Sequence, residues 1–140
     1  MGSALFSNLN WLAIAVAAIA YFMIGGLWYS KMLFAKMWIS GTGINMNDPN
    51  AKKGAGGIMF FTFLLEFIIC IGLAILINRL ELIGGVMSGL KLGLFTGFFF
   101  SAMVISISYL YQMKPKTLHF IDASYHIVGQ VAASIILCSW

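Results

Sequence analysis

Charged residues are scarce in this chain, and that scarcity excludes most soluble protein classes. Asp, Glu, Lys and Arg make up only 9% of the 140 residues, hydrophobic residues make up 61%, and the mean hydropathy is +0.97. Soluble domains contain about 25% charged residues. The composition therefore predicts an integral membrane protein with the lipid bilayer as its main partner. The formal net charge of +4 comes from a few lysines and does not indicate nucleic-acid binding.

The sequence also lacks the motifs that mark common enzyme classes. It has no Walker loop, no dinucleotide fingerprint, no serine elbow and no zinc-type cluster of Cys and His. The two cysteines, Cys70 and Cys138, fall in apolar segments at different heights, so we expect neither a disulfide nor a reactive thiolate. The ionisable residues lie at scattered depths, which argues against a metal site. We therefore expect no enzyme, no catalytic residue, no cofactor and no metal.

Four apolar stretches are long enough to cross a hydrocarbon core of roughly 30 Å, which takes about 20 helical residues. They cover residues 9–29, 56–78, 82–111 and 118–140. Because the only extended connection covers residues 30–55, we predict one all-α domain over residues 1–140, an integral membrane bundle of four transmembrane helices. The N-terminus has no basic region of the signal-peptide type, so we expect the first stretch to be retained.

The positions of the lysines predict the orientation. Lysines lie between the first and second stretches and between the third and fourth, whereas the opposite side has Arg79 in its connection. The lysines are Lys31, Lys36, Lys52, Lys53, Lys114 and Lys116. Positively charged loops stay in the cytoplasm, so we expect both termini outside and a location in a bacterial inner membrane.

Aromatic residues near the ends of the first stretch predict interface anchors. Trp11 is at one end, and Trp28 with Tyr29 is at the other, followed by Trp38 in the connection. Such amphipathic rings gather at the level of the lipid headgroups.

The connection itself has a pattern typical of a short surface helix. Residues 33–38 place an apolar face beside lysines, and residues 41–43 end the pattern with two glycines. We expect this helix to lie on the cytoplasmic membrane surface, with a docking surface for a partner as the alternative. Asp48 and Pro49 then predict the N-cap and first residue of the next helix.

Small residues recur at every fourth position of the third stretch. They are Gly85, Gly89, Gly93, Gly97 and Ser101. This glycine zipper is typical of helices in close contact, because small side chains let two backbones approach and gain van der Waals packing. The pattern leaves open whether the partner is a helix of the same chain or of a neighbouring copy.

Polar residues recur at every fourth position of the last stretch. They are Asp122, His126, Gln130 and Ser134, and they share one side of a helix. Because polar groups in lipid are costly, at about 2.5 to 3.5 kcal/mol for a charge at the centre, such residues often mark function. A second, shorter polar line runs through Thr62, Glu66 and Cys70.

These polar residues permit two interpretations. Glu66, His126 and Asp122 fall at depths that would suit a proton relay or ion pathway, and Lys91 falls near the height of Glu66, which would suit an ion pair. Lys91 is also opposite the glycine face, so it would otherwise extend to the outer headgroups. The alternative is structural: interhelical hydrogen bonds, with Asp122 capping the helix start or pairing with Lys116.

Several runs resemble one known family. Residues 25–30 (GGLWYS) with 33–38 (LFAKMW), residues 89–94 (GLKLGL), and residues 120–126 (FIDASYH) with a terminal Trp140 are similar to a bacterial membrane-protein family called domain of unknown function 1761. The chain departs from the family at Lys31, where many members have proline, and at Ser124, where glycine is usual. The resemblance implies a small four-helix inner-membrane protein, with no established activity from which residue roles could be transferred.

Two function classes follow from the sequence. The first is a homo-oligomeric conduit or transporter for protons, cations or a small solute, because the ionisable residues are more numerous than packing requires. The alternative is a non-enzymatic scaffold or accessory subunit of a larger membrane complex. A lipid-modifying enzyme is a weaker third option, since Asp122 and His126 are accompanied by no nucleophile or metal.

Overall fold

The computed structural model describes residues 2–140, and every regular element in that range is a helix. The elements are α1 (Gly2–Leu5), α2 (Trp11–Trp28), α3 (Ala35–Thr42), α4 (Ala55–Arg79), α5 (Val86–Thr96), the π-helix η1 (Gly97–Ala102), α6 (Met103–Tyr111) and α7 (Lys116–Ser139). Four helical runs are long and apolar enough to cross a membrane: α2, α4, the continuous α5–η1–α6 run and α7. The predicted all-α fold with four spans is confirmed.

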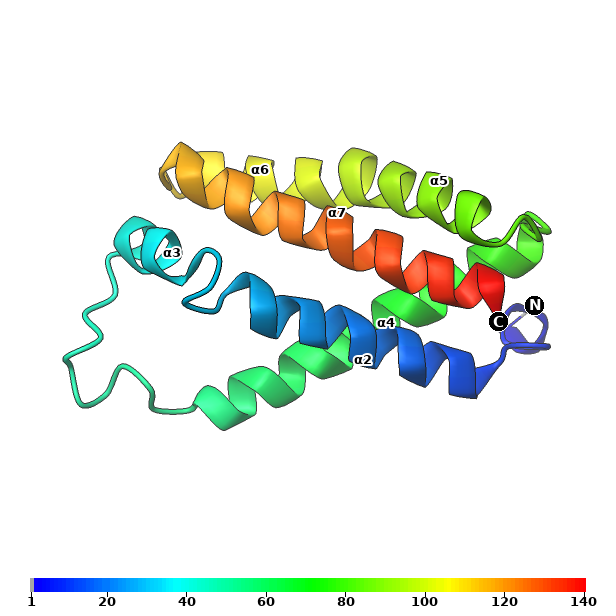
Figure 1. Cartoon of the computed structure of the whole chain (residues 1–140), viewed down its shortest axis with the longest axis horizontal. Coiled ribbons are helices and arrows are strands. Elements are labelled where there is room, and N and C mark those ends of the chain that lie inside the picture. The colour runs from blue at the N-terminus through cyan, green and yellow to red at the C-terminus, as the bar shows by residue number, and fades with distance from the viewer. Residues whose placement is uncertain (1) are drawn as a thin grey trace.

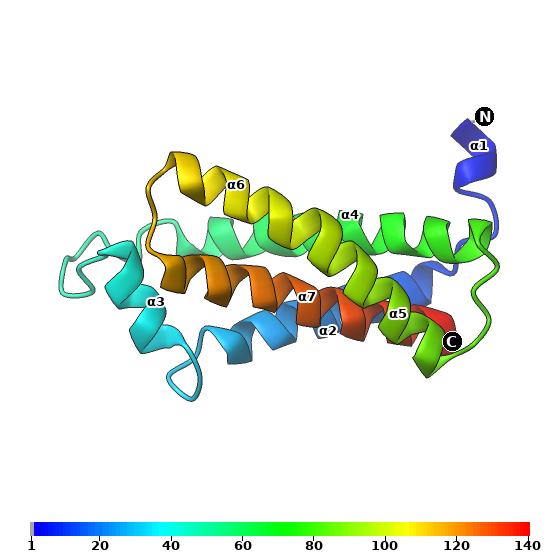
Figure 2. The same cartoon turned by 90° about the horizontal axis from the view of Figure 1, so that it is seen from above.

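The last helix, α7, is the centre of the bundle. It packs against α5, η1, α2 and α4, and Figure 1 shows it lying between the α5–η1–α6 run and α2. Figure 2 shows α3 at one end of the bundle and the chain termini at the other. Having both termini at one end fits an even number of spans, while the side of the membrane on which they lie stays a prediction.

The connection between the first two spans contains the expected short helix. α3 ends at Thr42 and is followed by Gly43, which adopts a left-handed conformation with φ of 73°, as helix-terminating glycines commonly do. The predicted helix start at Asp48 and Pro49 is wrong. The Asp48 carboxylate accepts a hydrogen bond of 2.9 Å from the backbone N–H of Asn50, which forms a local turn, and α4 begins only after Gly54.

The glycine face of the third span packs against α7 of the same chain. A Cβ atom added at these glycines would collide with the α7 backbone, so the two helices touch with no side chain between them. The facing pairs are Gly89 with Ile135, Gly93 with Val131 and Gly97 with Ile127. At these three positions, the contacting helix in the structure is α7 of the same chain. At the ends of the pattern, Gly85 precedes α5 with φ of 63°, and Ser101 makes a hydrogen bond to α7 instead.

The bundle interior divides into an apolar half and a polar half. Near the termini, α2, α4 and α7 bury small and aliphatic side chains, among them Ile14, Ala17, Leu73 and Ala133. Toward α3, the same helices bury tyrosines, carboxyl groups and a glutamine. Most of the buried polar groups thus lie toward α3, with Ser134 an exception near the termini, and the region toward α3 is the candidate site.

Candidate functional site

Hydrogen-bonded polar side chains from all four spans meet along α7. We call this group the polar core and define it by seven residues: Tyr21, Tyr29, Glu66, Tyr109, Asp122, Tyr125 and His126. Three of its members, Asp122, Tyr125 and His126, lie on two adjacent turns of α7. Each ionisable group of the polar core is hydrogen-bonded to a tyrosine hydroxyl from another helix or its flank.

Asp122 is the end of the polar core nearest α3. One carboxylate oxygen, Oδ1, accepts a hydrogen bond of 2.5 Å from the hydroxyl of Tyr29, which directly follows α2. The other, Oδ2, accepts one from the hydroxyl of Tyr109 on α6. Asp122 lies more than one turn inside α7, and both of its oxygens bind tyrosines. It therefore neither caps the start of the helix nor pairs with Lys116, the two structural roles that the sequence allows. A single carboxyl group instead joins three spans.

Glu66 lies in the interior between α2, α4 and α7, with only 2% of its surface exposed. Its Oε1 accepts a hydrogen bond from the hydroxyl of Tyr125, which also lies 3.2 Å from the backbone oxygen of Tyr21. Its Oε2 is buried with no hydrogen-bond partner within residues 2–140. Glu66 therefore does not form the ion pair with Lys91 that its height in the sequence had suggested.

His126 is hydrogen-bonded to the first span. Its Nδ1 lies 2.5 Å from the hydroxyl of Tyr21. Contacts between aromatic rings connect the hydrogen bonds of His126, Glu66 and Asp122. The Tyr21 and Tyr125 rings pack edge to face with centroids 5.5 Å apart, and the Tyr29 and Tyr125 rings do so at 5.4 Å. Such edge-to-face pairs are favourable beyond their buried area. The polar core is therefore one packed cluster.

Two glycines make room for the two central tyrosines. A Cβ atom on Gly25 of α2 would lie 2.6 Å from the hydroxyl oxygen of Tyr125 on α7. A Cβ atom on Gly129 of α7 would lie 2.5 Å from the ring of Tyr21 on α2. Each of the two helices thus places a tyrosine against a glycine of the other. This explains how two large rings fit between helices that are otherwise closely packed.

The remaining polar residues of α7 lie deeper in the bundle. Gln130 donates a hydrogen bond from Nε2 to the hydroxyl oxygen of Ser101 on η1. Ser134 is fully buried, and its hydroxyl has no partner among the described residues. The line from Asp122 to Ser134 spans roughly 18 Å at 1.5 Å per residue, more than half of a hydrocarbon core.

Two predicted pathway residues lie apart from the polar core. Lys91 is exposed on α5, on the side opposite the glycines that contact α7, next to exposed phenylalanines. The hydroxyl of Thr62 donates a hydrogen bond of 2.7 Å to the carbonyl of Ile58, one turn back in α4, so its polarity is satisfied within its own helix. Cys70 is buried one turn beyond Glu66, and both cysteines are free.

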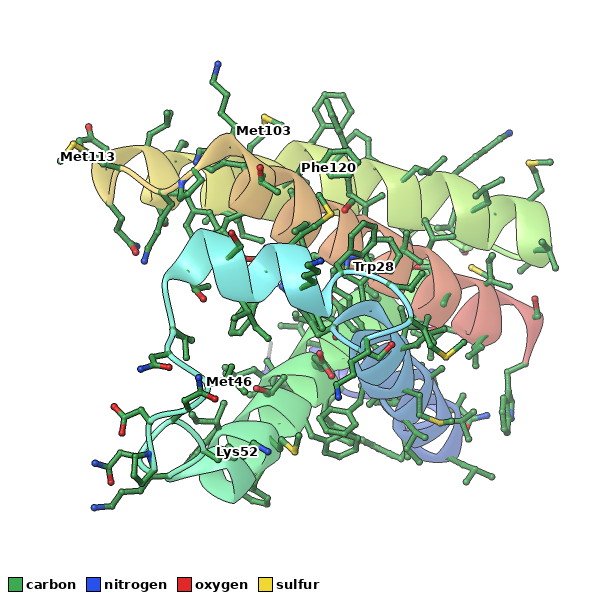
Figure 3. The ribbon with its side chains drawn as sticks, turned by 60° about the vertical axis from the view of Figure 1, so that its left-hand side comes forward. Trp28, Met46, Lys52, Met103, Met113 and Phe120 are labelled. Atoms are coloured by element: carbon green, nitrogen blue, oxygen red, sulfur yellow. The ribbon has the colours of Figure 1, made fainter. Side chains whose placement is uncertain are left out.

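The aromatic residues at the end of α2 face inward. Trp28 (labelled in Figure 3) donates a hydrogen bond of 3.0 Å from its indole nitrogen to the carbonyl of Ile121 on α7. Tyr29 binds Asp122 and lies edge to face with Trp38 of α3 at 5.8 Å. Trp11, at the other end of α2, is half exposed. These contacts join α2 to α7 and to α3 through Trp28, Tyr29 and Trp38, in addition to any contact with headgroups.

The sequence interpretation assigned Tyr29 to the membrane interface and gave no site role to Tyr21, Tyr109 and Tyr125, although all four bind the ionisable groups. A signal was present in α2, where Tyr21, Gly25 and Tyr29 recur every fourth residue and so share one face. On α7, Tyr125 directly precedes His126. Tyrosine is easily assigned to a membrane interface from sequence, because its ring is apolar and only its hydroxyl requires a partner.

The chemistry available to this cluster is proton exchange and hydrogen bonding. Within residues 2–140, no group of three His, Cys, Asp or Glu side chains is arranged to hold a metal ion. The cluster offers carboxyl, imidazole and phenol groups, all of which exchange protons with hydrogen-bonded neighbours. Glu66 and Asp122 bind neutral hydroxyl groups where a buried carboxylate would normally have a cation.

Comparisons with known proteins identify a family and no closer relative. The family model described as "Protein of unknown function (DUF1761)" matches residues 12–138, nearly the whole chain. Neither the curated proteins nor the solved structures include a match. The match covers all four spans and the polar core, and the chain therefore belongs to the DUF1761 family.

Proposed function

We propose that this protein is a non-enzymatic membrane conduit or transporter coupled to protons, and that Glu66 is the group that takes up and releases the proton. One observation carries the proposal: Glu66 is buried in the membrane-spanning bundle, and one of its two oxygens has no partner among the described residues. Ionisable residues inside a membrane commonly mark ion or proton pathways.

The free-energy cost of a buried negative charge explains why Glu66 favours binding a proton. An unpaired carboxylate in an apolar interior costs several kcal/mol, so a proton or a bound cation has to compensate its charge. The single tyrosine hydroxyl that binds Glu66 compensates only part of that cost. Proton transfer to and from Glu66 would change the local charge, and such a change can be coupled to transport.

The polar core supports a route on the side of α3. Asp122 is one turn closer to that end than Tyr125 and His126, and it binds the hydroxyls of Tyr29 and Tyr109. With the predicted orientation, protons would enter from the cytoplasm at Asp122 and reach Glu66 through Tyr125. Because no described hydrogen bond joins Asp122 or its two tyrosines to the Tyr125 hydroxyl, this step needs a bridging water molecule. Hydroxyl groups suit such transfer because each both donates and accepts a hydrogen bond.

At the end of the bundle near the termini, protons would leave by a different kind of route. A pocket of about 150 Å³ lies near the termini, lined in part by Asn8, Asn10, Asn78 and Leu137. The unpartnered hydroxyl of Ser134 lies about one turn of α7 inside Leu137. Transfer across the apolar half would require water to enter between these groups, and that step would serve as the gate.

A path for a solute larger than a proton would lie between copies of the chain, because four packed helices enclose little space. We therefore propose a homo-oligomer in a bacterial inner membrane. The lipid-facing surface available to a second copy is rich in phenylalanine, including Phe60 and Phe61 of α4 and Phe98 and Phe99 of η1. Native mass spectrometry of gently extracted protein would measure the copy number.

The test is proton flux in liposomes that contain the purified protein and a pH-sensitive dye. We expect Glu66→Gln to abolish proton uptake driven by a membrane potential, since the amide takes the place of the carboxyl group and cannot release a proton. Glu81→Gln is the matched control, because Glu81 is exposed in the connection after α4. It should leave the flux unchanged.

The glutamine variant also separates function from stability. An amide oxygen can still accept the hydrogen bond from Tyr125, so the fold should be retained, and a thermal unfolding scan checks this. If folded Glu66→Gln transports protons as fast as the unchanged protein, Glu66 has no part in the mechanism. If the unchanged protein itself shows no flux above empty liposomes, the conduit proposal fails.

A second function is favoured by a different observation. The hydrogen bonds of the polar core join α7 to the other three spans through Tyr21, Tyr109 and Glu66, as interhelical bonds of a rigid accessory subunit would. In that case, native mass spectrometry of the protein extracted from its own membrane should find a stoichiometric second protein. A pure homo-oligomer would favour the conduit.

A further inference from the structure

An open groove lies on the side of the bundle between α4 and the η1–α6 run. It has a volume of about 350 Å³ and is lined by Ile69, Phe100, Ser101, Val104, Ile105 and His126. Phe100 and Val104 are exposed at its rim, whereas the other four residues are partly buried. This size falls within the range of pockets that bind small molecules.

The depth of the groove limits its occupant to a lipid-soluble, uncharged molecule. His126 is the eleventh residue of the 24-residue helix α7, which begins at Lys116, so it lies about 15 Å along the span. That position is close to the middle of the hydrocarbon core. A phospholipid headgroup does not reach this depth, and a charged ligand would bear a high cost there.

Both polar residues of the groove can donate a hydrogen bond, His126 in the tautomer in which its Nδ1 accepts from Tyr21. The Ser101 hydroxyl oxygen accepts a hydrogen bond from Gln130, which leaves the Ser101 proton available. His126 Nδ1 is bonded to the hydroxyl of Tyr21 at 2.5 Å, and no described residue is bonded to Nε2. With Tyr21 as the donor, a neutral His126 carries its proton on Nε2. A ligand that fits has to offer oxygen acceptors.

The π-helix η1 places two of the lining residues. Phe100 and Ser101 lie in this six-residue segment, which interrupts the regular helix between α5 and α6. π-Helical turns are rare and frequently occur at functional sites, because the widened turn redirects side chains. Here the segment brings an aromatic ring and a hydroxyl group to the same groove.

We propose that this groove binds a lipid-soluble quinone, with a quinone carbonyl oxygen accepting hydrogen bonds from Ser101 and His126. A quinone is uncharged, has acceptor oxygens and no donor, and is soluble in the middle of the bilayer. The ring of Phe100 supplies an aromatic wall for the quinone ring, and the open side of the groove lets the apolar tail extend into lipid. The site does not depend on the proposed proton transport.

The test uses the whole protein in phosphatidylcholine nanodiscs and a photoactivatable benzoquinone with a ten-carbon tail. After illumination, mass spectrometry locates the labelled residues. We expect labelling around residues 100–105, reduced at least tenfold by excess unlabelled quinone of the same tail length and not by decanol. Ile105→Trp fills the groove and should abolish the labelling, whereas Ile107→Trp, on the exposed side of α6, should not.

A smaller change tests the hydrogen bonds without filling the groove. Ser101→Ala should weaken quinone competition about tenfold, which corresponds to about 1.4 kcal/mol, and the matched control Ser108→Ala, at an exposed position of α6, should not change it. Equal competition by decanol and quinone would identify an acyl-chain groove and overturn the proposal. Labelling spread evenly over the lipid-facing helices would overturn it as well.

Discussion

Gly25 on α2 and Tyr125 on α7 are complementary: the glycine provides the space that the tyrosine hydroxyl occupies. A Cβ atom on Gly25 would lie 2.6 Å from that hydroxyl oxygen and 3.0 Å from the ring carbon that bears it. The same hydroxyl binds Glu66. The absence of one methyl group thus makes room both for the contact between the helices and for the hydroxyl that is the sole hydrogen-bond partner of Glu66 within residues 2–140.

Replacing Gly25 with alanine should therefore destabilise the protein. The added methyl group forces Tyr125 to move, and overpacking of this kind costs about 1–3 kcal/mol. Gly26→Ala is the matched control, because a Cβ there meets no atom within 4 Å and alanine is the better helix former. Thermal unfolding in detergent micelles should show a lower midpoint for Gly25→Ala only. Equal midpoints would mean that the helix contact is looser than described.

The glycine face of the third span gives a second prediction. Gly93→Ala would place a methyl group into the α7 backbone at Val131, so it should lower the free energy of unfolding by more than Gly25→Ala does. The contact is internal, so the copy number in native mass spectrometry should not change. Gly72→Ala, at an open position of α4, serves as the control. A change of copy number without loss of stability would show that this face also binds another chain.

The four spans and a close contact at the glycines could be predicted from the sequence, because each pattern has one main physical cause. A run of about 20 apolar residues has few alternatives to a membrane span, and glycine at every fourth position predicts a close helix contact. The identity of the partner helix does not follow, because both α7 and a second copy could supply it. In the structure α7 supplies it, with the backbone of Val131 and Ile135 against Gly93 and Gly89.

The polar core was only half predictable. Asp122 and His126 stand out because they are costly in lipid, but their partners are tyrosines, which are common in membrane proteins for other reasons. Glu66 and Lys91 could be placed at similar heights from sequence, since height depends on counting residues. Their separation depends on the rotation of two helices, and α5 turns its glycine face to α7 and its lysine outward.

The outward position of Lys91 predicts that this residue does not contribute to transport. Lys91→Met should leave both the proton flux and the unfolding midpoint within error of the unchanged protein, because Lys91 is exposed and no ion pair or hydrogen bond joins its amine to any residue within 2–140. The liposome assay and the thermal scan measure the two quantities. A loss of flux equal to that of Glu66→Gln would show that the two residues act together, against the arrangement described here.

The last prediction concerns the two tyrosines that bind Asp122. Tyr109→Phe removes one hydrogen bond to the carboxylate and leaves the ring in place, so the expected loss is about 0.6–2 kcal/mol in the free energy of unfolding, typical of interhelical hydrogen bonds in membranes. Tyr111→Phe is the matched control, since Tyr111 is 88% exposed and belongs to the same helix. It should have no effect.

Combining Tyr109→Phe with Tyr29→Phe tests whether the two hydrogen bonds act as a unit. Each single change leaves Asp122 one partner, whereas the double change leaves its buried carboxyl group with neither. Because an unsatisfied buried group costs more than a lost hydrogen bond, the double variant should lose more stability than the sum of the single variants. Strict additivity would contradict this expectation and would mean that water entering from the α3 end replaces the missing hydroxyls.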